Sequence, residues 1–91
     1  MTASSEMIIA IDVFQAFPAE PLATFKATPV EELHDYHHTL GRMIRNEYGL
    51  WEQPWEAELV EGVDVSPHHP DAISMRIIRL VHQLALEKTH D

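Results

Sequence analysis

The stretch HHTLGRMIRNEYGLW, residues 37–51, decides the fold predicted for this chain. Its apolar residues recur at helical spacing, and Gly49 followed by Leu50 is typical of a helix that ends in a left-handed residue. Upstream, the segment TPVE, residues 28–31, combines an N-cap threonine, a first-turn proline and a capping-box glutamate. We therefore expect one continuous helix over about residues 29–48.

The remaining apolar segments are also predicted to be helical. The first segment contains β-branched residues and would also suit a strand, but a strand needs a partner, and only residues 63–65 resemble one. Glycine and proline signals at the ends of the segments set the boundaries. The expected fold class is all-α, a small bundle with three main helices over about 5–17, 29–48 and 71–88, and two short helices over about 20–26 and 54–61. Residues 1–91 then form one domain, with 1–4 as a frayed tail.

Composition limits the partners that the chain is expected to have. Fifteen acidic residues against six lysines and arginines give a formal net charge of −9, which opposes direct contact with nucleic acid or with an anionic membrane. The absence of cysteine excludes disulfides and thiolate metal sites, and it fits the cytoplasm, which is the compartment we expect. The apolar run within residues 7–17 is too short and too interrupted to span a bilayer.

Two parts of the sequence together resemble a widespread, uncharacterised bacterial domain family. Its signature is H-x-x-L-G-x-x-I-R-N-x-x-G-L-W, followed later by H-P-D-x-[IM]-S. Here the signature consists of His37, Leu40, Gly41, Ile44, Arg45, Asn46, Gly49, Leu50 and Trp51, then His69, Pro70, Asp71, Ile73 and Ser74. The resemblance implies an all-helical domain and brings no activity with it. Family members often have aromatic residues where this chain has His38 and Met43.

The motif residues allow two interpretations. The first is a pocket for a small molecule or a metal, enzymatic or not, built on His34, His38, Arg45, Asn46 and His69, with Gly41 and Asp71 beside it. The second is structural, with Gly41 allowing close packing of the last helix and Arg45 paired to Asp71. No H-E-x-x-H pattern, nucleophile elbow or phosphate-binding loop occurs. We therefore predict no catalytic residues, no bound metal and no cofactor.

The segment from Asn46 to Met75 contains seven carboxylates and no lysine or arginine. Acidic residues combined with tryptophans suit a basic surface on another protein, because complementary charge speeds encounter and aromatic side chains anchor the complex. Our leading hypothesis is a non-catalytic, acidic protein-binding module, including the inhibitor or nucleic-acid-mimicking type found among phage or mobile-element antagonists. The residues expected to carry it are Glu52, Trp55, Glu56, Glu58 and Glu61. The alternative is an ordinary solvated face whose tryptophans fill the core.

A third group of residues predicts self-association. Met75, His82 and Leu86 line up on the side of the last helix away from its main apolar stripe. An exposed apolar strip of this kind suggests a structural homodimer. The competing expectation is that the first helix covers these residues.

Overall fold

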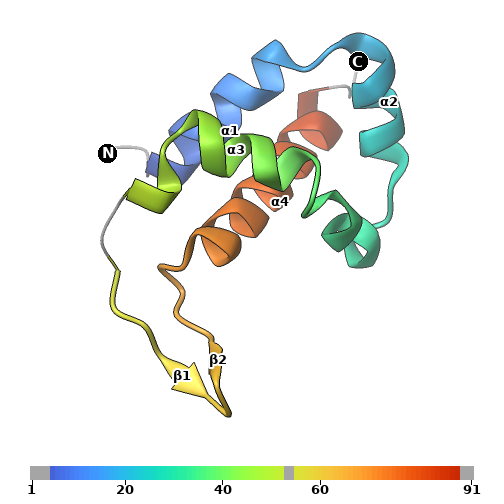
Figure 1. Ribbon diagram of the computed structural model, residues 1–91. Coiled ribbons are helices and arrows are strands. Elements are labelled where there is room, and N and C mark those ends of the chain that lie inside the picture. Colours follow the sequence, from blue (N-terminus) through green and yellow to red (C-terminus); the bar gives the residue numbers. More distant parts are fainter. Residues whose placement is uncertain (1–4, 53–54, 89–91) are drawn as a thin grey trace.

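The computed structural model describes residues 5–52 and 55–88, and it shows an all-α domain with one small β-hairpin (Figure 1). The predicted tail at 1–4 and the predicted helix start at Pro54 lie outside the described residues. The elements are α1 (Ser5–Ala16), α2 (Ala19–Ala27), the 3₁₀ helix η1 (Val30–Tyr36), α3 (Leu40–Glu47), the 3₁₀ helix η2 (Leu50–Glu52), strands β1 (Leu59–Val60) and β2 (Val63–Asp64), and α4 (Pro70–Lys88).

Helix α4 is the centre of the core, as its apolar periodicity predicts. Its side chains Ile77, Ile78, Val81 and Ala85 are fully buried. Each of the other helical elements adds one or two buried apolar side chains around them, namely Ala10, Val13, Phe25, Leu33, Ile44 and Leu50. Arg76 of α4 also donates two hydrogen bonds of 2.9 Å to the Glu6 carboxylate of α1. Within the described residues no helix is long and apolar enough to cross a membrane.

The expected single helix over 29–48 is wrong, because the chain forms η1, a turn, and then α3. The break lies at Thr39, whose φ of −109° and ψ of −86° are not helical. The turn removes the His37 carbonyl from the helical hydrogen-bond ladder, and Arg45 Nη2 donates to that oxygen at 3.1 Å instead. A tertiary contact thus replaces the helical bond that the spacing predicts.

The predicted N-cap at Thr28 is also wrong. The Thr28 hydroxyl donates backward to the Thr24 carbonyl at 3.0 Å, so it serves the end of α2 and not the start of the next helix. The residue before η1 is Pro29, which makes no side-chain cap hydrogen bond. In contrast, the predicted end of α3 is confirmed, with Gly49 at φ +61° and Leu50 buried after it.

The short helix expected over 54–61 is wrong as well, because the described part of this segment contains no helix and leads into the hairpin of β1 and β2. Leu59 pairs with Asp64, and Val60 pairs with Val63. Glu61 and Gly62 between them have φ of +52° and +81°, the positive values of a two-residue hairpin turn. The hairpin projects beyond the helical body (Figure 1).

Candidate functional site

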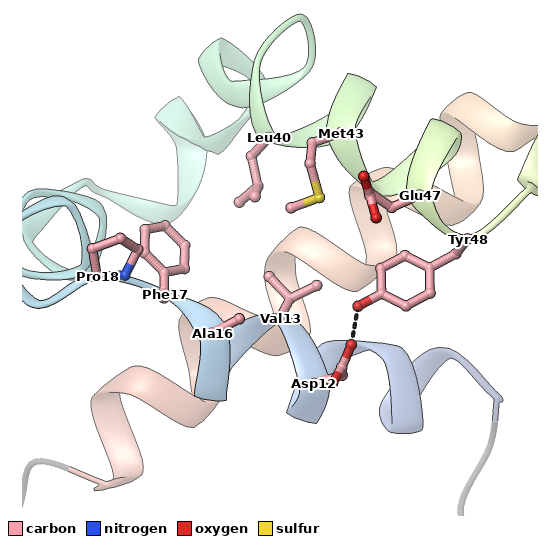
Figure 2. A pocket seen from close by; sticks show the side chains of 9 residues that line it. All are labelled: Asp12, Val13, Ala16, Phe17, Pro18, Leu40, Met43, Glu47 and Tyr48. Atoms are coloured by element: carbon pink, nitrogen blue, oxygen red, sulfur yellow. Dashed lines mark hydrogen bonds between the residues drawn. The ribbon is translucent and has the colours of Figure 1, made fainter.

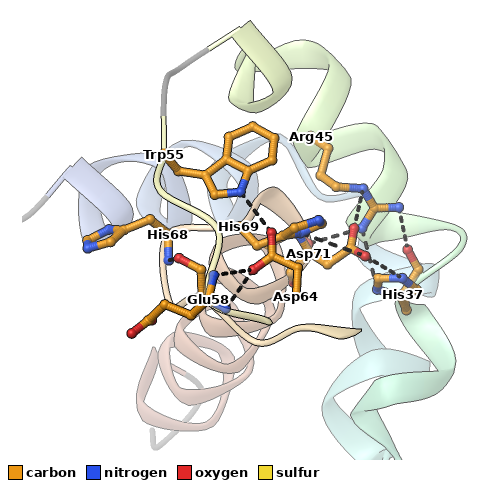
Figure 3. Close-up of polar contacts among 10 residues, drawn as sticks. His37, Arg45, Trp55, Glu58, Asp64, His68, His69 and Asp71 are labelled. Atoms are coloured by element: carbon orange, nitrogen blue, oxygen red, sulfur yellow. Dashed lines mark hydrogen bonds and ion pairs between the residues drawn. The ribbon is translucent and has the colours of Figure 1, made fainter. Parts of the chain in front are cut away.

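The two halves of the sequence signature meet at a polar cluster, called here the motif knot, in which the buried Arg45 and Ser74 contact the partly exposed His37 and Asp71. Arg45 is only 6% exposed. Its Nη1 donates to Ser74 Oγ at 3.0 Å, and its Nε lies 3.6 Å from Asp71 Oδ1. The Ser74 hydroxyl in turn donates to the Asp71 carbonyl at 3.0 Å. Figure 3 shows Arg45 of α3 directed at Asp71 in the first turn of α4. The knot therefore joins α3 to α4.

Gly41 is a glycine because Arg45 occupies the space beside it. A Cβ built at Gly41 would lie 2.9 Å from Arg45 Nη1 and 3.4 Å from the Tyr36 carbonyl oxygen. The guanidinium cannot easily move aside, because several hydrogen bonds hold it. The close approach at Gly41 and the pair of Arg45 with Asp71 are the features that the structural interpretation of the motif predicts.

His69 caps α4. Its Nδ1 accepts a hydrogen bond of 3.0 Å from the Asp71 backbone N–H, which satisfies one of the free donors at the helix start. The same ring packs against the rings of Trp51 and Trp55 at centroid distances of 5.6 and 5.3 Å. His69 thus connects the knot to the two tryptophans.

The remaining pocket candidates lie outside the hydrogen bonds and ion pairs of the knot. His34 is exposed, and its Nε2 lies 3.2 Å from Asp35 Oδ1. His38 is exposed as well, and its ring packs edge-on against the ring of His37 at a centroid distance of 4.9 Å. Asn46 is exposed too, and among the described residues its side chain makes no hydrogen bond. In the part of the chain that the structure describes, no group of three or more histidine and carboxylate side chains is placed to hold a metal ion.

A second polar centre is Asp64, which fixes the root of a segment that we call the arm, residues 55–65. Its Oδ2 accepts from Trp55 Nε1 at 3.1 Å, and its Oδ1 accepts from the backbone N–H groups of Glu58 and Ser66 at 3.1 and 3.0 Å (Figure 3). The bond from Ser66 first, and then the bonds from Trp55 and Glu58, hold the pKa of the Asp64 carboxyl below its ordinary value. One carboxylate therefore shapes the whole arm.

The arm exposes both aliphatic and acidic side chains. Four aliphatic residues in and next to the hairpin, called here the aliphatic tip, have exposed fractions of 54–69%, namely Leu59, Val60, Val63 and Val65. The carboxylates of Glu56, Glu58 and Glu61 are exposed beside them, and so is Glu52 at the end of η2. Among the described residues, none of the ion pairs involves these four glutamates. Trp51, which is 49% exposed, does not fill the core.

The predicted self-association strip is not a continuous surface. His82 is buried, and its Nε2 lies 2.9 Å from the Thr28 carbonyl oxygen. Met75 is partly buried against the core, while Leu86 is 41% exposed. His82 is therefore a core residue, held between the end of α2 and the ring of Phe25.

Sequence reasoning missed two parts of this region. The first is the role of Asp64, although an aspartate side chain in a turn-rich segment often accepts from the backbone N–H two residues further on. The aliphatic tip was also missed, although the run LVEGVDV, residues 59–65, places a glycine-containing turn between β-branched residues.

Comparison with known proteins bears on the family and not on the activity. Neither the curated proteins nor the solved structures contain a match to this chain. The sequence model of one family, described as a domain of unknown function (DUF6794), matches residues 10–84. That span contains both halves of the signature and the whole arm, and it covers most of the chain. The chain therefore belongs to the DUF6794 family.

Proposed function

We propose that this protein is a non-catalytic protein-binding module that uses the arm to dock on a partner with an apolar cleft and a basic rim. The observation that carries the proposal is the joint exposure of the four aliphatic tip residues and the acidic residues beside them. Full burial of a valine or leucine side chain is worth about 1.5–3 kcal/mol, and the fold leaves this free energy unused at the tip. A partner that covers the tip would gain it.

The charge of the arm defines the partner further. Glu56, Glu58 and Glu61 have no cation of their own chain beside them among the described residues, so their field is not neutralised. Lysine and arginine side chains around a cleft would complement this field and speed association. A groove that normally holds nucleic acid has this character, and it supports the more specific proposal of an inhibitor that mimics nucleic acid.

The root of the arm favours binding for an entropic reason. The three hydrogen bonds accepted by Asp64 and the packing of Trp55 on His69 fix the arm before any partner arrives. A segment that is already ordered loses less conformational entropy when it binds. The arm is therefore better suited to docking than a flexible loop of the same composition.

The test compares three forms of the protein as bait in lysate of the organism that encodes it. One form is wild type, one is the arm variant Glu56→Lys/Glu58→Lys/Glu61→Lys, and the matched control is Glu31→Lys/Glu32→Lys/Glu87→Lys, which reverses three exposed carboxylates elsewhere. Mass spectrometry should find a protein captured by wild type and by the control, and lost from the arm variant.

The captured partner is then purified, and its affinity is measured at several salt concentrations. We expect the arm variant to bind at least 100-fold more weakly and to lose the salt dependence seen with wild type. A second variant, Leu59→Ser/Val63→Ser, should weaken binding without changing the salt dependence. If the arm variant and the control bind the partner equally, the arm is not the docking surface.

A further inference from the structure

A separate surface lies between α1 and α3, where the side chains surround a hollow (Figure 2). Both helices pack mainly on α4, and the hollow lies in the space between them. The volume of the hollow is about 340 Å³. This value is near the lower end of the range of about 300–1,000 Å³ that small-molecule sites occupy.

The walls of the hollow are mostly apolar. Leu40, Met43 and Glu47 are spaced by three and four residues, so they lie on one face of α3. The facing side chains come from the second half of α1 and the residues after it, namely Val13, Ala16, Phe17 and Pro18. A second hollow of about 490 Å³ shares Phe17, Leu40 and Met43 and continues the apolar surface toward α2.

The rim of the hollow is acidic on both sides. Asp12 of α1 accepts a hydrogen bond from the Tyr48 hydroxyl. Burial, together with this hydrogen bond and the charges of Asp12 and Glu47, raises the pKa of Tyr48 to about 12, so the phenol stays a neutral donor. Among the described residues, no side chain bonds the Glu47 carboxylate, and no lysine or arginine lines either hollow.

We propose that this hollow binds a small amphiphilic cation, a molecule with a hydrocarbon body and one protonated amine. The body lies against Ala16 and Met43, and the amine lies at the rim beside Glu47 and Asp12. An anionic ligand would be repelled by these carboxylates, and a neutral apolar ligand would desolvate Glu47 without pairing it. The site is independent of the arm, which contributes none of its lining residues.

The test is a titration of the full chain with n-octylammonium chloride, followed by backbone and methyl NMR signals. Octanoate, which has the same chain length and the opposite charge, is the matched control ligand. We expect saturable shifts confined to residues around the hollow, such as Ala16, Met43 and Tyr48. Octylammonium should bind at least tenfold more tightly than octanoate.

Three variants locate the site. Glu47→Gln should weaken octylammonium binding about threefold, as expected for a partly exposed ion pair. Ala16→Trp, which fills the hollow from an exposed position, should abolish binding, whereas Glu31→Gln, an exposed carboxylate on η1, should change nothing.

The following results would overturn the proposal: equal binding of octylammonium and octanoate, shifts centred on the arm, no saturable binding, or no effect of Glu47→Gln. Binding of a basic amphipathic peptide at these residues, in the absence of octylammonium binding, would instead assign the hollow to a protein helix.

Discussion

Arg45 in the motif knot and Asp64 in the arm both gather several hydrogen bonds, but in opposite surroundings. Arg45 is a buried donor that joins two helices far apart in the sequence, and each of its contacts holds the helical body together. Asp64 is an acceptor whose partners lie within nine residues, and it shapes a segment that projects from that body. Residues from both parts of the motif quoted in the sequence analysis thus hold the helical body together, whereas the surface suited to binding lies between those two parts.

Removal of the Arg45 guanidinium should have the largest effect on stability. Arg45→Met leaves the buried Ser74 hydroxyl and the His37 carbonyl without their Arg45 donor, and it removes the ion pair with the half-exposed Asp71 carboxylate. We therefore expect a loss of about 2–4 kcal/mol in the free energy of unfolding. Urea denaturation measures it. The matched control is Arg42→Met, an exposed arginine on the same helix, which should change stability by less than about 0.5 kcal/mol. Equal effects of the two substitutions would contradict the structural role of the knot.

Substitution of Gly41 by alanine should change stability in different directions in wild type and in the Arg45→Met background. Gly41→Ala gains about 1 kcal/mol from helix propensity but places a Cβ against Arg45 Nη1, and crowding of this kind costs about 1–3 kcal/mol. We expect a net loss of about 1 kcal/mol in wild type. In the Arg45→Met background the crowding atom is gone, so the same substitution should become neutral or stabilising. A double-mutant cycle from denaturation curves tests this, and additive effects would show that the two residues are not coupled.

The contacts of Arg45 also show how much of the structure can be predicted from the sequence. The pairing of Arg45 with Asp71 is one of the two interpretations that the motif allows, and α4 follows from its proline start and long apolar stripe. The break before α3 does not follow, because it depends on Arg45 reaching the His37 carbonyl, a contact that exists only in the folded chain. Local spacing alone continues the helix through Thr39.

The arm was harder to predict for a different reason. Strands β1 and β2 have two residues each, which is too short for an alternating pattern to be distinguished from a helical one. The acidic residues were recognised from composition, but their arrangement was not, because Asp64 sets it through backbone N–H groups that carry no side-chain signal. Composition therefore indicated the charge of the surface and not its shape.

Protonation of Asp64 should loosen the arm and leave the helical body folded. Its folded-state pKa is lowered, so the stability it contributes is present above the unfolded value, near 3.8, and is lost as the pH falls through the lower folded value. The NMR signal of the Trp55 indole N–H should therefore titrate below pH 3.8, while the signals of α4 core residues such as Ile78 stay unchanged. In Asp64→Asn this transition should be absent. Simultaneous changes in α4 would show that the arm and the body unfold together.

The smallest expected effect on stability is at the arm tip. It is measured by making the same exchange, valine to threonine, at an exposed and at a buried position. Val63→Thr exchanges a methyl for a hydroxyl on a side chain that is 61% exposed in a strand, where threonine is well accommodated, so stability should change by less than about 0.5 kcal/mol. Val81→Thr makes the same exchange in the buried core and should cost about 1–3 kcal/mol, because the hydroxyl loses water. If Val63→Thr is as costly as Val81→Thr, the tip contributes to folding. It would then not be the free apolar surface that the proposed docking requires.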